Sequence, residues 1–453
     1  MRWIGTTLLA MAIAISSEAQ AQTDQQRQFI EQHPARQVFL NNCARCHGAG
    51  LGGMIGPSFL DDEWRYEPGV EGVEKSIRSG HGRLGMPSFS KTLTDEQIAS
   101  LAHYLANAHK PDPVLPGEGD NATAEPDPAA TTAGDELTHY LLVYFTDPTH
   151  ALHFALSDDG YTFTALNNGA PVMTFEDIAD QKGIRDPHIA RAPDGTFVLA
   201  MTDLHIFGQQ EGHRDTQWDR PGDAWGWGNN RGFVVSTSDD LVNWTHHNIR
   251  IDELGPRYRE VGCAWAPELT WDDQRDRMMI HFTIRYNNDP NRLVYAYLND
   301  DYSALETAPK LLFHYPKDVN TIDSDITRFK DKYYLLFTPH DGGAGVKMAV
   351  SDRLTGGYVY QDRWIDPEPE ACEGPSVWRR LGSDTYVLMY DVFGKQPHNF
   401  GFCETTDFET FTPIGSFNDG PMKATNFTSP KHGAVIHLTA REAERLRKAF
   451  PSD

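Results

Sequence analysis

The sequence is poor in basic residues, in cysteines and in long apolar runs. Its 453 residues include 40 lysines and arginines against 64 aspartates and glutamates, which gives a formal net charge of −24. A phosphate backbone or an anionic membrane surface would be repelled by this charge, so no nucleic acid partner is expected. After the N-terminus no segment approaches the roughly 20 apolar residues of a spanning helix, so no stable membrane anchor is expected either.

The one marked apolar cluster lies at the N-terminus. Arg2 precedes a nearly continuous apolar stretch from Ile4 to Ile15, and Ala19-Gln20-Ala21 offers a cleavage site of the A-x-A type. This pattern predicts a signal peptide at residues 1–21. We therefore expect a periplasmic or secreted protein.

Two of the five cysteines form a motif with a histidine. Cys43, Cys46 and His47 have the spacing C-x-x-C-H, which is typical of covalent haem c attachment. In such a motif two thioethers hold the haem and the histidine is an axial iron ligand. An exported protein would expose its three further cysteines to oxidising conditions. They could form one disulfide and leave one free thiol, or they could stay as three buried thiols. These are Cys263, Cys372 and Cys403.

An abrupt change of composition divides the chain. Residues 111–136 contain five prolines and seven acidic residues but no lysine or arginine. Such a stretch cannot bury enough apolar surface to order itself, so it predicts an extended linker. The linker would separate an N-terminal domain at residues 22–110 from a C-terminal domain at residues 137–453.

A short phrase that contains Ser or Thr followed by Asp recurs in the C-terminal domain. Clear copies start at Ser157, Ser238 and Thr405, and weaker ones at Asn299 and Ser351. Successive copies are 81, 61, 52 and 54 residues apart, and short alternating or aromatic-rich segments between them have the character of strands. The repeat predicts an all-β propeller of five blades. A two-sheet sandwich is the alternative.

The residues around the C-x-x-C-H motif resemble class I cytochromes c over about residues 26–109. Gly56-Pro57 is similar to the loop behind the proximal histidine, and the segment Gly85-Met86-Pro87-Ser88-Phe89 is similar to the loop that carries the sixth iron ligand. The resemblance implies a small all-α domain with one haem c, with His47 and Met86 as iron ligands. Met54 and His81 are the rivals of Met86. One-electron transfer with a redox partner protein would be the role of such a domain.

A helix is predicted to close this domain. Thr94 and Gln97 have the spacing of a capping box, and the following apolar residues share one helical face. These are Ile98, Leu101, Ala102 and Leu105.

The C-terminal domain resembles glycoside hydrolase family 43 over about residues 138–447. The matching segments are R-D-P at 185–187, W-A-P-E at 265–268, I-D-S-D at 322–325, E-G-P at 373–375 and H-G at 432–433. Members of this family are five-bladed propellers that act mostly on arabinose-, xylose- or galactose-containing glycans. The resemblance implies Asp186 as general base, Glu373 as general acid and Asp323 as the residue that tunes the acid. It also implies that His432 helps to hold a calcium or other cation at the centre.

Inverting glycosidases need one carboxylate to activate water and one carboxylic acid to protonate the leaving oxygen. A third carboxylate near the acid would keep it protonated by like-charge repulsion. In the family a proline usually follows the tuning Asp, whereas here Ser324 and Asp325 follow, so Asp323 and Asp325 both stay candidates. Taken singly, Asp186-Pro187 and Glu373-Gly374-Pro375 also fit turns, and His432 also fits a buried structural histidine.

Three functions are compatible with these patterns. In the first, an exported electron-transfer cytochrome is fused to an inverting glycosidase whose substrate is an oligo- or polysaccharide. In the second, the propeller is a non-catalytic sugar-binding or docking module. In the third, it is a sugar oxidoreductase that reduces the haem, but the sequence has no dinucleotide-binding glycine fingerprint to support this.

Overall fold

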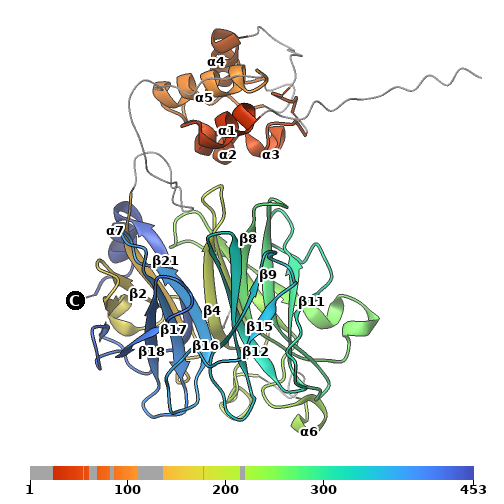
Figure 1. Cartoon of the computed structure of the whole chain (residues 1–453), viewed down its shortest axis with the longest axis vertical. Coiled ribbons are helices and arrows are strands. Elements are labelled where there is room, and N and C mark those ends of the chain that lie inside the picture. Colours follow the sequence, from red (N-terminus) through yellow and green to blue (C-terminus); the bar gives the residue numbers. More distant parts are fainter. Residues whose placement is uncertain are drawn as a thin grey trace, which may run out of the picture. The chain divides into compact units, whose positions relative to one another are not determined.

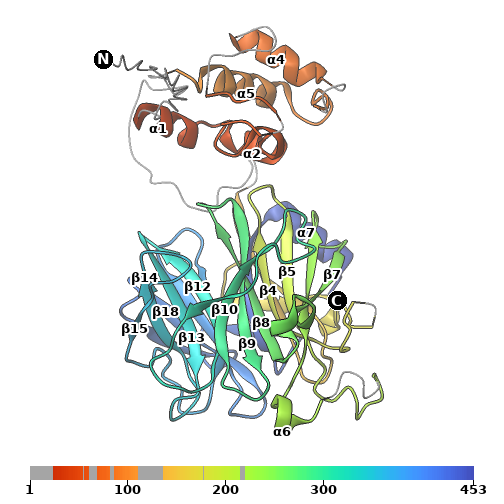
Figure 2. The same ribbon diagram turned by 90° about the vertical axis from the view of Figure 1, so that its right-hand side faces the viewer.

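The chain forms two compact units, residues 1–130 and 131–453 (Figures 1 and 2). The computed structural model describes residues 24–54, 56–60, 69–81, 86–110, 136–176, 178–214 and 220–452. The predicted signal peptide at 1–21 and the predicted linker, except Glu136, lie outside the described residues. None of the helices that the structure describes is long and apolar enough to cross a membrane.

The first unit is all-α, as predicted. Its helices are α1 (Asp24–Gln32), α2 (Arg36–Asn42), α3 (Ala44–His47), α4 (Gly69–Ser79) and α5 (Asp95–Asn107). Phe39 of α2 and Tyr104 of α5 are fully buried in the apolar core that these helices share. The C-x-x-C-H motif thus spans the short helix α3, directly after a helix that is anchored in the core.

The capping box predicted for the closing helix is confirmed at the start of α5. The Thr94 hydroxyl accepts a hydrogen bond from the Gln97 amide, and the Gln97 side chain accepts one from the Thr94 amide. The predicted apolar face is buried in the core; its residues are Ile98, Leu101, Ala102 and Leu105.

The second unit consists of five sheets. The first four are β4-β5-β6-β7, β8-β9-β10-β11, β12-β13-β14-β15 and β16-β17-β18-β19, each in sequence order, and the fifth is β20-β3-β2-β1-β21. The strands of the first two sheets are β4 (Ile184–Arg191), β5 (Phe197–Asp203), β6 (Gly232–Ser238), β7 (Thr245–Arg250), β8 (Val261–Asp272), β9 (Arg277–Tyr286), β10 (Arg292–Tyr297) and β11 (Lys310–Phe313). Those of the next two are β12 (Thr321–Phe329), β13 (Lys332–Pro339), β14 (Lys347–Ser351), β15 (Val359–Gln361), β16 (Glu373–Arg379), β17 (Tyr386–Val392), β18 (Asn399–Thr405) and β19 (Thr412–Ser416).

The fifth sheet closes the ring with strands from both ends of the domain. It contains β1 (Leu137–Phe145), β2 (His153–Ser157), β3 (Thr162–Ala165), β20 (Lys423–Thr425) and β21 (Lys431–Thr439). Antiparallel pairing of β1 with β21 joins the two ends. Five sheets with one closing blade make the predicted five-bladed propeller, and the sandwich alternative is wrong.

Short helices complete the second unit. They are η2 (Asn167–Gly169), α6 (Gly222–Trp225), η3 (Ile251–Glu253), η4 (Pro256–Tyr258) and α7 (Ala440–Ala449). A second capping box, formed by Thr439 and Glu442, starts α7. Glu442 also binds both terminal nitrogens of Arg191 on β4, at 2.7 and 2.9 Å, and so ties the closing blade to the first sheet.

The repeated phrase forms the turn between the third and fourth strands of a blade. In the closing blade, the Ser157 hydroxyl accepts the Gly160 amide at 2.9 Å, and the Asp159 carboxylate accepts the Tyr161 and Thr162 amides at 2.7 Å each. The copies at Ser238 and Thr405 make the same contacts in their blades. The three clear copies thus share one side-chain turn. The weaker copies at Asn299 and Ser351 lie at the same place in the two remaining blades, after β10 and at the end of β14, so the five copies mark the five blades.

Candidate functional site

The proximal side of the predicted haem site is built around His47. Its Nδ1 lies 2.9 Å from the Pro57 carbonyl oxygen and donates to it. This contact leaves Nε2 free for iron, since a ligating imidazole usually donates its other ring proton to such an acceptor. A Cβ on Gly56 would lie 2.6 Å from the His47 ring, so the close approach of this loop requires glycine.

The other predicted haem residues also suit the group. Cys43 is buried, Cys46 is half-buried, and neither forms a disulfide, so both thiols are free to make thioethers. Met86 packs against the apolar core, whereas 71% of Met54 is exposed. Its rival His81 pairs with Met86 in an isolated β-bridge. His47 and Met86 are the residues that would hold the haem iron, which would supply one-electron chemistry.

In the propeller, each innermost strand carries a β-bulge. Strands β4, β8, β12, β16 and β21 each have one residue more than the neighbouring strand at this point. The bulges contain Asp186, Ala266, Asp323, Gly374 and His432. The first four of these residues have φ between +44° and +60°. A bulge bends its strand and redirects a side chain, so the bulges bring side chains from different blades to one central site.

Asp186, the predicted base, is held as an anion. The Thr202 hydroxyl donates to its Oδ2 at 2.7 Å, and Nδ1 of His432 lies 3.5 Å from its Oδ1. Burial alone would raise the pKa of Asp186, but the hydrogen bond and charge of His432, with those of Arg185 and Thr202, outweigh burial and lower the pKa to about 2. The carboxylate is therefore ionised at neutral pH.

Glu373, the predicted acid, is held in the protonated form. Burial is the main cause that raises its pKa to about 8, and the neighbouring charge of Asp323 raises it further. Burial also raises the pKa of Asp323 to about 6 and that of Asp325 to about 7. Asp323 acts on Glu373, whereas Asp325 accepts a hydrogen bond from the Val377 amide. Electrostatics thus favours Asp323 over Asp325 as the tuning residue.

His432 lies among carboxylates. Its Nδ1 is 3.5 Å from Asp186 and 3.9 Å from Asp323, and its Nε2 is 3.8 Å from Glu268. Burial opposes protonation, but hydrogen bonds to Asp186 and Glu268 raise the pKa of His432 well above its usual value. These contacts favour an ion-pairing role for His432. His188, Glu268 and Asp325 have ligand atoms within 4.8 Å of one another and could hold a cation instead.

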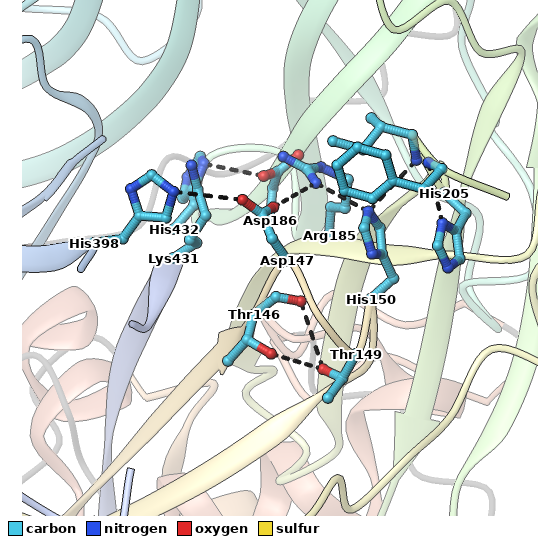
Figure 3. A network of polar contacts seen from close by, with 12 residues as sticks. Thr146, Asp147, Thr149, His150, Arg185, Asp186, His205, His398, Lys431 and His432 are labelled. Atoms are coloured by element: carbon cyan, nitrogen blue, oxygen red, sulfur yellow. Dashed lines mark hydrogen bonds and ion pairs between the residues drawn. The ribbon is translucent and has the colours of Figure 1, made fainter. Parts of the chain in front are cut away.

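Arg185, next to Asp186, is fixed by the turn between β1 and β2 (Figure 3). Its Nη1 donates to Asp147 Oδ1 at 3.0 Å and to His150 Nε2 at 3.2 Å, and its guanidinium lies over the Phe145 ring. Burial, followed by the charge of Arg185, lowers the pKa of His150 to about 3, so this ring stays a neutral acceptor. On the other side, His398 Nε2 lies 3.5 Å from Asp147.

A second cation flanks the predicted acid. Lys431 Nζ lies 3.4 Å from Asp391 Oδ2, and Asp391 is fully buried. Asp391 also pairs in register with Glu373 across β16 and β17. The positive charge of Lys431 lowers the pKa of Glu373 and so opposes the effect of burial, whereas the negative charge of Asp391 raises this pKa.

Sequence reasoning missed Asp147, Lys431, Asp391 and His398. Asp391 and His398 lie near the turn between the second and third strands of their blade, and Asp147 lies in a turn of another blade. One local signal existed, because Lys431 directly precedes the predicted His432. The three cysteines outside the haem motif are buried and free.

Family models match both units. The model of a probable glycosyl hydrolase domain covers residues 135–444, more than half of the chain, and the chain belongs to this family. The model of the cytochrome c oxidase cbb3-type subunit III covers residues 31–105. The chain is thus a cytochrome c domain, of the kind that binds haem c covalently, fused to a domain like glycoside hydrolase family 43.

Individual relatives match one unit each. An α-L-arabinofuranosidase of Bifidobacterium longum is 25% identical over 213 residues, which is 41% of this chain and 18% of that protein. The cbb3-type cytochrome c oxidase subunit FixP of a Bradyrhizobium species is 33% identical over 104 residues, 21% of this chain and 36% of that protein. The chain thus spans well under half of these relatives.

Among solved structures, an endo-arabinase of Bacteroides thetaiotaomicron is similar. The sequences are 16% identical, and the match covers 61% of this chain and 89% of that one with a TM-score of 0.44.

Proposed function

We propose that the propeller is an inverting glycoside hydrolase for arabinose-, xylose- or galactose-containing glycans. The observation that carries this proposal is the opposed protonation of two buried carboxyl groups in one central site. The pKa of Asp186 is about 2 and that of Glu373 about 8. Groups whose surroundings drive their pKa values apart in this way suit an acid and a base at neutral pH.

In the proposed reaction, Asp186 accepts a proton from the water that attacks the anomeric carbon. Thr202 and His432 fix the two carboxylate oxygens, so the base is oriented before substrate binds. Glu373 gives its proton to the leaving oxygen, and burial, with the charge of Asp323, keeps that proton on Glu373 in the free enzyme. The product sugar then has the inverted anomeric configuration.

An aromatic surface supports the sugar-binding part of the proposal. Trp265 precedes the bulge residue of β8, and its Nε1 donates to the Gly228 carbonyl. The ring of Trp227 lies edge-on to it at 6.0 Å between centroids, and 67% of Trp227 is exposed. Exposed indole rings of this kind stack on sugar faces.

The test uses purified full-length protein with aryl α-L-arabinofuranoside, β-D-xyloside and β-D-galactoside. We expect turnover of at least one substrate, and a loss of several hundredfold or more in Asp186→Asn and Glu373→Gln. Glu260→Gln is the matched control, because Glu260 is exposed and its side chain takes no part in the contacts described for the site. NMR of the first-formed anomer checks inversion. Wild-type turnover no higher than that of the two site variants would overturn the proposal.

We further propose that the haem c unit exchanges single electrons with a redox partner protein outside the cytoplasm. The His47 environment and the packed Met86 support this, because His/Met ligation favours a high potential. The unit should cycle between oxidised and reduced spectra with one covalent haem per chain. Removal of residues 1–21 should abolish haem attachment in a bacterial host, and an unchanged haem content would contradict export.

A further inference from the structure

A compact loop follows β5 at the edge of the propeller site. It covers residues 204–214, and we call it the His205 loop. The Gly208 amide donates to the His205 carbonyl at 3.1 Å, and the His213 amide donates to the Gly208 carbonyl at 2.8 Å. Arg214 Nη1 donates to the same His205 carbonyl at 2.6 Å. These bonds fold the loop back on itself, so His205 and His213 face each other.

Three potential ligands meet in this loop. His205 Nε2 lies 3.5 Å from Glu211 Oε2, and His213 Nε2 lies 3.4 Å from the same oxygen. All three ligand atoms are within 4.8 Å of one another. The two histidine rings are 5.0 Å apart between centroids.

These separations fit a coordination sphere better than a hydrogen-bonded cluster. N–H to O hydrogen bonds in proteins measure about 2.7 to 3.2 Å between heavy atoms, which is shorter than both contacts. Ligands at about 2.0 to 2.1 Å from a tetrahedral zinc ion are about 3.3 Å from one another. The measured edges of 3.4 and 3.5 Å are close to this value.

The surroundings suit metal binding as well. His205 is 2% exposed, and its ring lies 3.9 Å from that of His150 and 5.4 Å from that of Phe175 between centroids, so neighbouring rings fix its orientation. Glu211 and His213 are exposed on the other side, which leaves a way in for an ion. One cost exists. Nδ1 of His205 accepts the Phe207 amide at 3.3 Å, and this long bond must be given up when Nε2 becomes a ligand.

We propose that His205, Glu211 and His213 bind one divalent transition-metal ion of the zinc type, with a coordination position open to solvent. Two imidazoles and one carboxylate are a common donor set for such ions. The site uses none of the predicted haem ligands and none of the carboxyl groups proposed for the reaction at Asp186. It still touches the Asp186 site, because the His205 ring stacks at 3.9 Å on His150, which contacts Arg185 (Figure 3).

The test measures Zn²⁺ binding to full-length holoprotein after chelator treatment, which leaves covalent haem in place. Equilibrium dialysis followed by elemental analysis gives zinc per chain, with haem iron as the internal count. We expect Glu211→Gln and His213→Ala each to weaken binding at one site at least tenfold. His246→Ala is the control, because His246 is an exposed histidine on β7. Unfolding curves of all variants verify that the partly exposed replacements leave the fold intact.

X-ray absorption at the zinc edge identifies the ligands. We expect two imidazole nitrogens and a carboxylate oxygen at about 2.0 to 2.1 Å. Binding that is equally tight in wild type, Glu211→Gln and His213→Ala would overturn the proposal. A zinc spectrum without imidazole ligands would overturn it too. Neither result depends on glycosidase activity, so failure of the proposed hydrolysis leaves this test unaffected.

Discussion

The alkaline side of the pH profile should report the protonation of Glu373. With a pKa of about 8, about half of the free enzyme carries this proton at pH 8 and about a tenth at pH 9. If Glu373 is the acid, kcat/KM should fall about tenfold per pH unit above pH 8. The base should produce no acid limb above about pH 3, because the pKa of Asp186 is about 2.

The fall of kcat/KM above pH 8 is the alkaline limb of the profile. Two substitutions should move this alkaline limb in opposite directions. Asp323→Asn removes the like charge that adds to burial at Glu373, so the pKa of Glu373 and the limb should shift to lower pH. Lys431→Met removes an opposing positive charge, so the limb should shift to higher pH. A general loss of packing would not produce shifts of opposite sign.

The assay measures kcat/KM from pH 5 to pH 10 on the best aryl glycoside, in a buffer series of constant ionic strength. Two substrates with different leaving groups separate the roles. Glu373→Gln should harm the substrate with the poorer leaving group more, because only that substrate needs strong acid assistance, whereas Asp186→Asn should harm both. If the limb keeps its position in both Asp323→Asn and Lys431→Met, Glu373 is not the acid.

Three further predictions concern the haem and the stability of the propeller. Met86→Ala should lower the reduction potential on the order of 0.1 V, measured by spectroelectrochemistry, while Met54→Ala should leave it unchanged because that side chain is exposed. Glu442→Ala should destabilise the propeller by about 1 to 3 kcal/mol in thermal unfolding, because it removes both a helix cap and the ion pair with Arg191; no change in Tm would contradict this. Glu373 is protonated in the fold up to a pKa of about 8 and unfolded only up to about 4.5, so its contribution to stability is full below pH 4.5 and is lost as the pH rises through 8. The stability of Glu373→Gln relative to wild type should therefore grow by a few kcal/mol between pH 5 and pH 9, and a constant difference would refute the buried neutral acid.

Features with local causes could be predicted from the sequence. The Thr94 capping box needs only residues three apart, and the turn at Ser157 is made by side chains that bond amides within a few residues. Because a copy of that phrase occurs once per blade, counting the copies in the sequence gave the number of blades. The haem motif is equally local, since Cys43, Cys46 and His47 lie within five consecutive residues.

Features that depend on which blades meet could not be predicted in this way. The contact of Asp147 with Arg185 joins residues 38 positions apart, and that of Lys431 with Asp391 joins the first residue of β21 to β17 of another blade. No spacing rule connects such residues in the sequence. The role of His432 is a similar case: its ring faces Asp186, Asp323 and Glu268 only because three other blades converge on β21.

The same backbone feature, a β-bulge, lies at the predicted base, Asp186, and next to the predicted acid, Glu373. Gly374 follows the predicted acid with φ of +60°, and a Cβ there would lie 2.8 Å from the His432 ring. A side chain at this position would displace the His432 ring and so disturb the contact that lowers the pKa of Asp186. The acid and the base are therefore linked through one histidine, because room for that ring depends on the residue next to the acid. For this reason Gly374→Ala should impair the base as well as the acid, although it changes neither carboxylate.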